Sequence, residues 1–264
     1  MNIPDYQTLN CKLHHQHLEI RLNRPHRLNA VVEQLYQELL HVLGIARMET
    51  AIRAIVLTGE GRAFCVGADL KEHSTGNRTL LQKRQYLQLA NDVCEQIFNH
   101  PKPIIAAVNG YALGAGAEIA LACDFIVIAE TAEIGFPEAS IGTCVGGGIS
   151  QTLPRLVGLA KARELLLSSQ RINGQQAQEI GLASRVASDS QLLEEASSLA
   201  QQLASNAPLS MALTKQLLNK GHNQSLDTCL QLELDGIATC MASKDWQEGI
   251  DAFAEKRAPL FNGS

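Results

Sequence analysis

Apolar and polar residues follow two different periods along the first half of the chain. Short runs of alternating or β-branched apolar residues are typical of strands. Five such runs predict strands, at residues 17–23, 52–58, 104–108, 125–129 and 132–136. Apolar residues recur at helical spacing over 31–46 and 83–98, and residues 117–122 add one or two helical turns. Strands that alternate with helices predict an α/β fold with buried, mostly parallel strands.

The segments between these elements differ in character. Residues 63–70 form a short apolar stretch around Gly67, and residues 110–116 are small and predict a turn. Residues 71–82 are polar, so we expect a mobile loop there.

The second half of the chain has mainly helical spacing. Five segments predict helices, at residues 156–167, 192–205, 208–220, 225–242 and 246–256. Residues 180–186 interrupt this series with a turn and a short strand. We therefore divide the chain into an α/β part, residues 1–195, and a helical part, residues 196–264. Because no Gly/Ser/Pro-rich linker separates them, we expect the helical part to pack on its own core or on a neighbouring subunit.

The charge of the chain argues against one class of function. Only 19% of the 264 residues are charged and the formal net charge is −5, whereas average chains are roughly 25% charged. So apolar a chain is not disordered, and its mild acidity argues against a nucleic-acid binder with a basic face. A small anionic ligand would need only a few local cations. The low charge also suggests that part of the surface is buried in a subunit interface.

The cysteines and the N-terminus lead us to expect a cytoplasmic protein without a resident metal. The seven cysteines include no CxxC pair and fit no zinc spacing, and the first residues have neither a signal-type apolar run nor an Arg-rich transit pattern. Residues 104–129 could be mistaken for a membrane span, but Asn109, Glu118 and Asp124 interrupt them. Each acid would cost about 2.5–3.5 kcal/mol at a bilayer centre, so we expect no membrane partner.

Two turns rich in small residues follow predicted strands. One is FCVGAD, residues 64–69, and the other is NGYALGAGAE, residues 109–118, which opens a helix. Small residues let backbone N–H groups approach a ligand, and at a helix N-terminus these groups are unpaired. Two such turns facing each other would form an oxyanion hole from the main chain alone; the plainer alternative is a pair of tight connections. The spacing matches neither a GxGxxG/A dinucleotide motif nor a P-loop.

Two glutamates lie in apolar surroundings. Glu118 begins a helix in an otherwise apolar stretch, and Glu138 follows a buried strand. Burial raises the pKa of a carboxyl group toward the working range of a general acid or base. Each residue alone has a plainer explanation, a helix N-terminal charge for Glu118 and a surface loop acid for Glu138.

Four segments together identify a family. FCVGADLKE, AAVNGYALGAGAE, ACDFIVIAETAEIGFPE and GGGISQTLPRLVG resemble the crotonase superfamily, that is, the enoyl-CoA hydratase/isomerase family. The resemblance runs from LNRPHRLNA near residue 22 to DAFAEKRAPLF in the tail. It implies a crotonase-like spiral of repeated ββα units, with a C-terminal helical region that joins subunits into a homotrimer or a dimer of trimers.

The resemblance also implies roles for single residues. The backbone N–H groups of Ala68 and Ala115 would form the oxyanion hole, and Glu118 and Glu138 would be the two catalytic glutamates. The family often has Gly at the position of Ala115. Because the backbone N–H group is the donor, alanine can replace glycine there if its backbone angles allow.

The loop around Gly146 departs from the family pattern. Gly146 matches a backbone donor near the water in family hydratases. Around it, Val145, Ile149 and Thr152 replace the usual Pro, Gly and Arg. The shape of the acyl pocket therefore does not follow from the resemblance.

The resemblance implies coenzyme A as part of a substrate thioester, and no cofactor beyond it. The adenine would lie against the backbone around Val66 and Ala68, with a cation at Lys71. Three further cations lie where family members approach the CoA phosphates, namely His26, Arg27 and Arg62. Lys256 matches a lysine that reaches CoA in an adjacent subunit. For each cation the alternative is a solvated surface charge.

Taken with the resemblance, these residues predict an enoyl-CoA hydratase. Water would add across the 2,3 double bond of a 2-enoyl-CoA thioester to give a 3-hydroxyacyl-CoA. We expect Glu118 to act as base toward the water and Glu138 to protonate the α-carbon. The alternatives are an enoyl-CoA isomerase or another CoA-thioester enzyme of this fold, and a non-catalytic family member that binds RNA.

Overall fold

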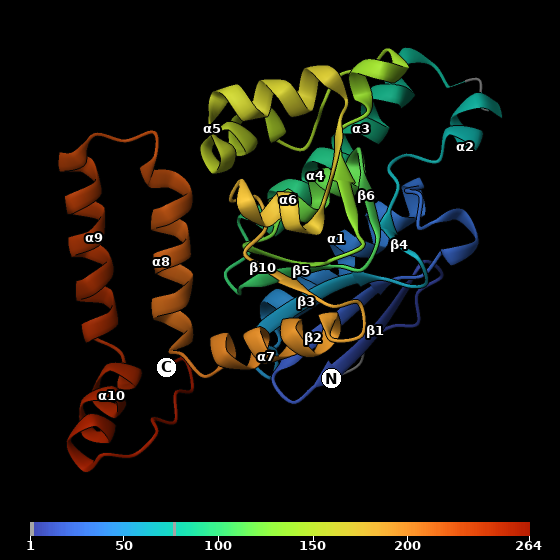
Figure 1. Ribbon diagram of the computed structural model, residues 1–264. Coiled ribbons are helices and arrows are strands. Elements are labelled where there is room, and N and C mark those ends of the chain that lie inside the picture. Colours follow the sequence, from blue (N-terminus) through green and yellow to red (C-terminus); the bar gives the residue numbers. More distant parts are fainter. Residues whose placement is uncertain (1–2, 76–77) are drawn as a thin grey trace.

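Three successive ββα units build the core of the protein (Figure 1). The computed structural model describes residues 3–75 and 78–264, without the side chains of 73–75. The units are β3 (Ala54–Gly59), β4 (Ala63–Cys65) and α3 (Leu80–Phe98); β5 (Ile104–Val108), β6 (Tyr111–Leu113) and α4 (Ala115–Ala122); and β7 (Phe125–Ala129), β8 (Glu133–Gly135) and α5 (Ile149–Ser168). This repetition agrees with the predicted spiral of ββα units.

Each unit places its first strand in one sheet and its second strand in another. The larger sheet has the order β1-β2-β3-β5-β7-β10 and the smaller one β4-β6-β8-β9. The added strands are β1 (Leu9–His14), β2 (His17–Leu22), β9 (Arg171–Asn173) and β10 (Arg185–Ala187). Strands β4, β6 and β8 are parallel, so their carboxyl ends lie at one edge of the smaller sheet. The segments that follow these strands therefore meet there.

Helices bury the larger sheet on both sides. In Figure 1, α7 (Leu192–Ala204) lies on one side of it, and α3, α4 and α5 lie on the other. Every residue of β3 and β5 is buried, which explains their continuous apolar sequence. Helix α1 (Glu33–Met48) packs against α3 and buries its apolar stripe around Leu35, Leu39 and Leu43.

Two expectations about the loops were wrong. We expected a mobile loop over residues 71–82, but residues 71–75 belong to α2 (Leu70–Thr75). The Glu72 N–H group of this helix donates to the Asp69 carboxylate. Helix α3 starts at Leu80 because Thr79 and Gln82 form a capping box; residues 76 and 77 lie outside the described part. The predicted turn at 110–116 contains β6, which pairs with β4 and β8.

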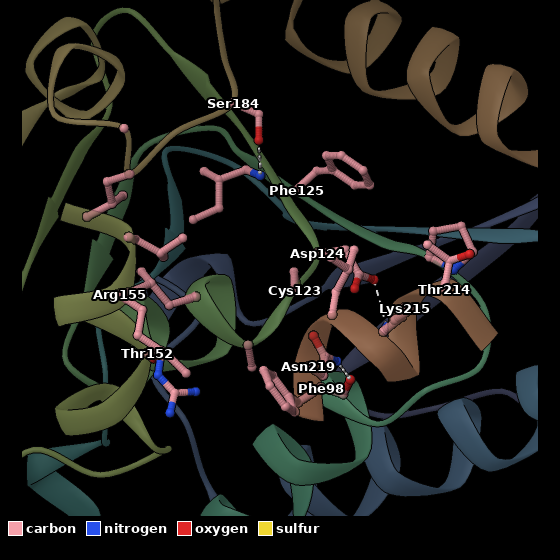
Figure 2. A pocket seen from close by; sticks show the side chains of 18 of the residues that line it. Phe98, Cys123, Asp124, Phe125, Thr152, Arg155, Ser184, Thr214, Lys215 and Asn219 are labelled. Atoms are coloured by element: carbon pink, nitrogen blue, oxygen red, sulfur yellow. Dashed lines mark hydrogen bonds and ion pairs between the residues drawn. The ribbon is translucent and has the colours of Figure 1, made fainter. Parts of the chain in front are cut away.

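The last three helices lie beyond the core. In Figure 1, α8 (Pro208–Gly221), α9 (Leu226–Met241) and α10 (Lys244–Glu255) stand apart from the sheets. Lys215 of α8 reaches the core, where its Nζ atom lies 2.7 Å from Asp124 Oδ2 beside a cavity of about 530 Å³ (Figure 2). Helix α7 packs on the sheet, and the division of the chain at residue 195 stays a prediction.

Over residues 3–75 and 78–264, no helix combines the length and the apolar character that a membrane span requires. The cytoplasmic location stays a prediction.

Candidate active site

Three segments meet at the carboxyl edge of the smaller sheet. Gly67 and Ala68 follow β4, Gly114 and Ala115 follow β6, and Glu138 follows β8. A Cβ atom placed on Gly67 would lie 3.5 Å from the Ala115 N atom, and one placed on Gly114 would lie 3.0 Å from Glu138 Oε1. The structure thus brings together the two small-residue turns and the second glutamate.

Two backbone N–H groups at this edge have no hydrogen-bond acceptor among the described residues. Ala68 forms a parallel bridge with Val31, in which the hydrogen bonds use Gly67 O and the Asp69 N–H group. The Ala68 N–H group therefore points to the other side. Ala115 is the first residue of α4, so no preceding turn of helix accepts its N–H. Two such donors can stabilise negative charge on one oxygen atom.

Alanine is compatible with position 115 because its backbone is helical. The unusual conformation lies one residue earlier, at Gly114, with φ 54° and ψ −124°, a region that residues with a Cβ avoid. The departure from the family pattern at Ala115 therefore needs no strained backbone.

The two glutamates are buried and differ in their partners. Glu118 lies on α4, one turn after Ala115, and Glu138 begins the 3-10 helix η2 (Glu138–Ile141); they are 7% and 6% exposed. The Gly146 N–H group donates to Glu118 Oε1 over 2.6 Å. Glu138 Oε2 has no hydrogen-bond partner in the described part of the chain. Only Glu118 therefore has a donor from the glycine loop that stabilises its charge.

Burial raises the pKa of both glutamates above the ordinary value. For Glu118, desolvation is opposed by the Gly146 N–H group, while the charge of Glu138 adds to the increase. For Glu138, desolvation outweighs a hydrogen bond from its own backbone. A raised pKa brings a carboxyl group closer to the range in which a general acid or base works.

Two glycines of one loop, Gly146 and Gly147, lie against the Glu118 side chain. Gly147 has φ 58°, and a Cβ atom there would lie 2.8 Å from Glu118 Cβ and 3.0 Å from Cys94 Sγ. Its N–H group donates to Asn91 Oδ1 over 3.4 Å. From the sequence, only Gly146 of this loop was given a role of its own, and the GGG run was the signal that pointed to Gly147.

The candidate CoA contacts divide into two groups. Five lie on segments next to β4: His26, Arg27, Arg62, Val66 and Lys71. The Val66 N–H group donates to Leu28 O over 3.3 Å, which joins β4 to the turn that carries His26 and Arg27. Lys256 follows α10, and in Figure 1 this helix lies far from α2 and β4. The single chain therefore does not bring Lys256 to the other contacts.

Two polar residues beside the site, Arg24 and Asn29, were not expected from the sequence. Arg24 pairs with Asp69 over 3.2 Å. Asn29 is fully buried, and its side chain donates to Ala63 O over 2.8 Å and accepts from the Arg24 N–H group. Both lie in NRPHRLNA, where only the exposed cations were considered. Over the described residues, no group of three or more His, Cys, Asp or Glu side chains could hold a metal ion.

The repeated ββα core, with three segments meeting at one sheet edge, is that of a crotonase-type protein. Residues 15–264 match the family model for enoyl-CoA hydratase/isomerase, so the chain belongs to this family. It is 36% identical to a short-chain-enoyl-CoA hydratase of Clostridium acetobutylicum (90% of this chain, 91% of the relative). It is 39% identical to a 2,3-dehydroadipyl-CoA hydratase of Escherichia coli (93% and 95%). The crystal structure of an enoyl-CoA hydratase from Bacillus anthracis superposes with a TM-score of 0.94 at 37% identity, over 98% of this chain and 100% of that one.

Proposed function

We propose that this protein hydrates 2-enoyl-CoA thioesters to 3-hydroxyacyl-CoA. The observation that carries the proposal is the meeting of two buried glutamates with two backbone N–H groups that have no acceptor among the described residues. Relatives named as enoyl-CoA hydratases at 36–39% identity support the same reaction class.

In the proposed reaction, the thioester oxygen lies between the N–H groups of Ala68 and Ala115. Glu118 takes a proton from water while the water oxygen bonds to the β-carbon, and the electron pair of the double bond moves toward the thioester oxygen. Glu138 then gives its proton to the α-carbon and the thioester reforms. Each N–H donor contributes on the order of 3–4 kcal/mol to such a transition state, and general acid–base help contributes roughly 10²–10⁴-fold.

The different partners of the glutamates support this division of roles. The Gly146 N–H group stabilises the carboxylate form of Glu118, which suits a base. Glu138 Oε2 has no such donor in the described part of the chain, which favours the protonated form that an acid needs. The charge of Glu138 also raises the pKa of Glu118, so we expect the protonation states of the two groups to depend on each other.

Glutamine variants test the proposal. Glu118→Gln and Glu138→Gln should each lower kcat for crotonyl-CoA hydration by roughly 10²–10⁴-fold, measured as loss of the enoyl absorbance. Binding of the product should be retained, since neither change alters the backbone donors. Unchanged hydration in both variants would refute the mechanism. A protein that moves the double bond of a 3-enoyl-CoA but adds no water would be an isomerase instead.

The surface of α9 supports an oligomer, as the family resemblance implies. Five of its apolar side chains are 54–73% exposed and lie on one face: Leu226, Leu230, Leu234, Ile237 and Met241. No residue of α8 or α9 is buried in the single chain, and exposed apolar stripes of this size mark interaction surfaces. We infer that copies of this chain cover the stripe in a homotrimer or a dimer of trimers, in which Lys256 would reach CoA on the neighbouring subunit. Sedimentation equilibrium should give the mass of a trimer or of a dimer of trimers, and the mass of a monomer would refute the inference.

A further inference from the structure

The orientation of the Ala68 N–H group depends on a contact across the chain. Gly67 O and the Ala68 N–H group belong to one planar peptide unit, in which they point in opposite directions. The Val31 N–H group donates to Gly67 O over 2.7 Å. This bond therefore directs the Ala68 N–H group away from Val31 and toward the open side of the site.

Arg24 joins the two chain segments that make this contact. One guanidinium nitrogen donates to Ala30 O, next to Val31, and Nη2 lies 3.2 Å from Asp69 Oδ2, next to Ala68. The side chain of Arg24 is only 16% exposed and that of Asp69 10%. The guanidinium thus binds both sides of the bridge, one residue away from each bridge partner.

Asp69 is itself held at three points. Its N–H group donates to Val31 O over 2.9 Å, and its carboxylate accepts from Arg24 and from the Glu72 N–H group. Burial raises the pKa of Asp69, but these donors outweigh it and the pKa lies below the ordinary value. The residue after Ala68 is therefore an anchored carboxylate that depends on Arg24 for its only ion pair among the described residues.

We propose that Arg24 is a positioning residue, which orients the Ala68 N–H group through Ala30 O and the Asp69 carboxylate. It differs from His26 and Arg27, which lie exposed on the same turn as candidate CoA contacts. The inference rests on the proposed function in one respect, because it needs the Ala68 N–H group to meet the thioester oxygen. Loss of Arg24 should then slow the chemical step and leave binding of the CoA nucleotide intact.

Two thioesters of the same acyl group separate these effects. In Arg24→Met, kcat for crotonyl-CoA should fall by about 10–100-fold, less than the 10²–10³-fold for removing an oxyanion donor altogether. The fold loss in kcat/KM should be the same for crotonyl-N-acetylcysteamine, which lacks the nucleotide. Arg27→Met, the comparison variant, should raise KM for the CoA thioester only.

A bound chromophore reports the oxyanion hole directly. The absorption band of 2,4-hexadienoyl-CoA moves to longer wavelength when hydrogen bonds polarise its carbonyl group. At saturating ligand, the shift should be smaller in Arg24→Met than in the unaltered protein and should be unchanged in Arg27→Met. A merely structural role would lower Tm and leave the band shift of the folded protein unchanged.

Asp69→Asn provides a second variant if Arg24→Met does not fold. Asparagine also caps helices well, so the Asp69→Asn variant keeps the bond from the Glu72 N–H group and loses only the ion pair with Arg24. A smaller band shift in this variant supports the proposal. A full band shift with unchanged kcat in the folded variant, or a loss confined to the CoA thioester, would overturn it. If the unaltered protein polarises the chromophore but hydrates no thioester, the proposed function fails and this inference is still tested by the shift. If it does not polarise the chromophore, both the oxyanion hole and the role of Arg24 are wrong.

Discussion

Replacing Gly147 with alanine tests whether the glycine loop sets the position of the Glu118 side chain. The new Cβ atom would lie 2.8 Å from Glu118 Cβ and 3.0 Å from Cys94 Sγ. Carbon atoms in contact prefer about 3.5–4.0 Å, so the loop and Glu118 must separate by roughly 1 Å. This separation also stretches the 2.6 Å hydrogen bond from the Gly146 N–H group to Glu118 Oε1.

Gly148→Ala is the matched control. Gly148 also has a positive φ, 81°, but a Cβ atom there would meet nothing within 4 Å. Both variants place alanine in the left-handed region, which costs roughly 1–2 kcal/mol of unfolding free energy. Only Gly147→Ala displaces Glu118, the proposed base, and a misplacement of about 1 Å can cost up to about 10²-fold in rate. We therefore expect kcat to fall by about 10–100-fold in Gly147→Ala and to change little in Gly148→Ala.

Two measurements decide the outcome. Urea unfolding gives the stability of both variants, and loss of the enoyl absorbance of crotonyl-CoA gives kcat. If Gly147→Ala keeps the kcat of the unaltered protein, or if both variants lose the same factor, contact with Glu118 is not what the glycine protects. A stability loss in Gly147→Ala without a rate loss would assign the residue to folding alone.

Two further predictions concern stability. His100 is buried, with Nδ1 3.2 Å from the Lys102 N atom and Nε2 3.3 Å from Leu43 O, and desolvation lowers its pKa from 6.5 to about 4. The contribution of neutral His100 to the free energy of unfolding is therefore complete above pH 6.5, and about 3 kcal/mol of it is lost as the pH falls to 4. The free energy of unfolding in urea, measured against pH, should therefore fall less steeply in His100→Gln than in the unaltered protein. An equal slope in both proteins would assign the effect to other groups. Lys215→Met leaves the Asp124 carboxylate without its 2.7 Å partner, so it should cost about 3–5 kcal/mol, and Lys215→Met/Asp124→Asn should recover part of this. A loss below about 1 kcal/mol in Lys215→Met would show that the pair behaves as a surface pair.

Strands β3 and β5 of the larger sheet could be predicted because they are buried on both faces. A residue in β3 or β5 has no solvent side, so apolar and β-branched residues fill the whole strand and mark it in the sequence. The same reasoning marked the two glutamates as candidates, since a carboxyl group in such surroundings is costly unless it is used; their expected roles came from the family resemblance. Both signals are local, and each needs only the residues on either side.

Strand β6 of the smaller sheet and the helix α2 could not be predicted because their causes are distant. Strand β6 has three residues, and its place depends on pairing with β4 and β8. Helix α2 depends on Asp69, which accepts from the Glu72 N–H group and is held by Arg24, 45 residues earlier. In both cases the stabilising partner is supplied by the fold, so a window along the chain contains no sign of it.

The glycine run shows most clearly why a site cannot be derived from residue types alone. Gly146 supplies an N–H group to Glu118, Gly147 leaves room for the stem of the same side chain, and Gly148 has only a positive φ and empty space around its missing Cβ. The same letter is therefore required by a hydrogen bond, by a close approach and by a backbone angle at three successive positions. A sequence presents them as equivalent, and only the position of Glu118 relative to each one separates a constraint set by the candidate site from a constraint set by the backbone.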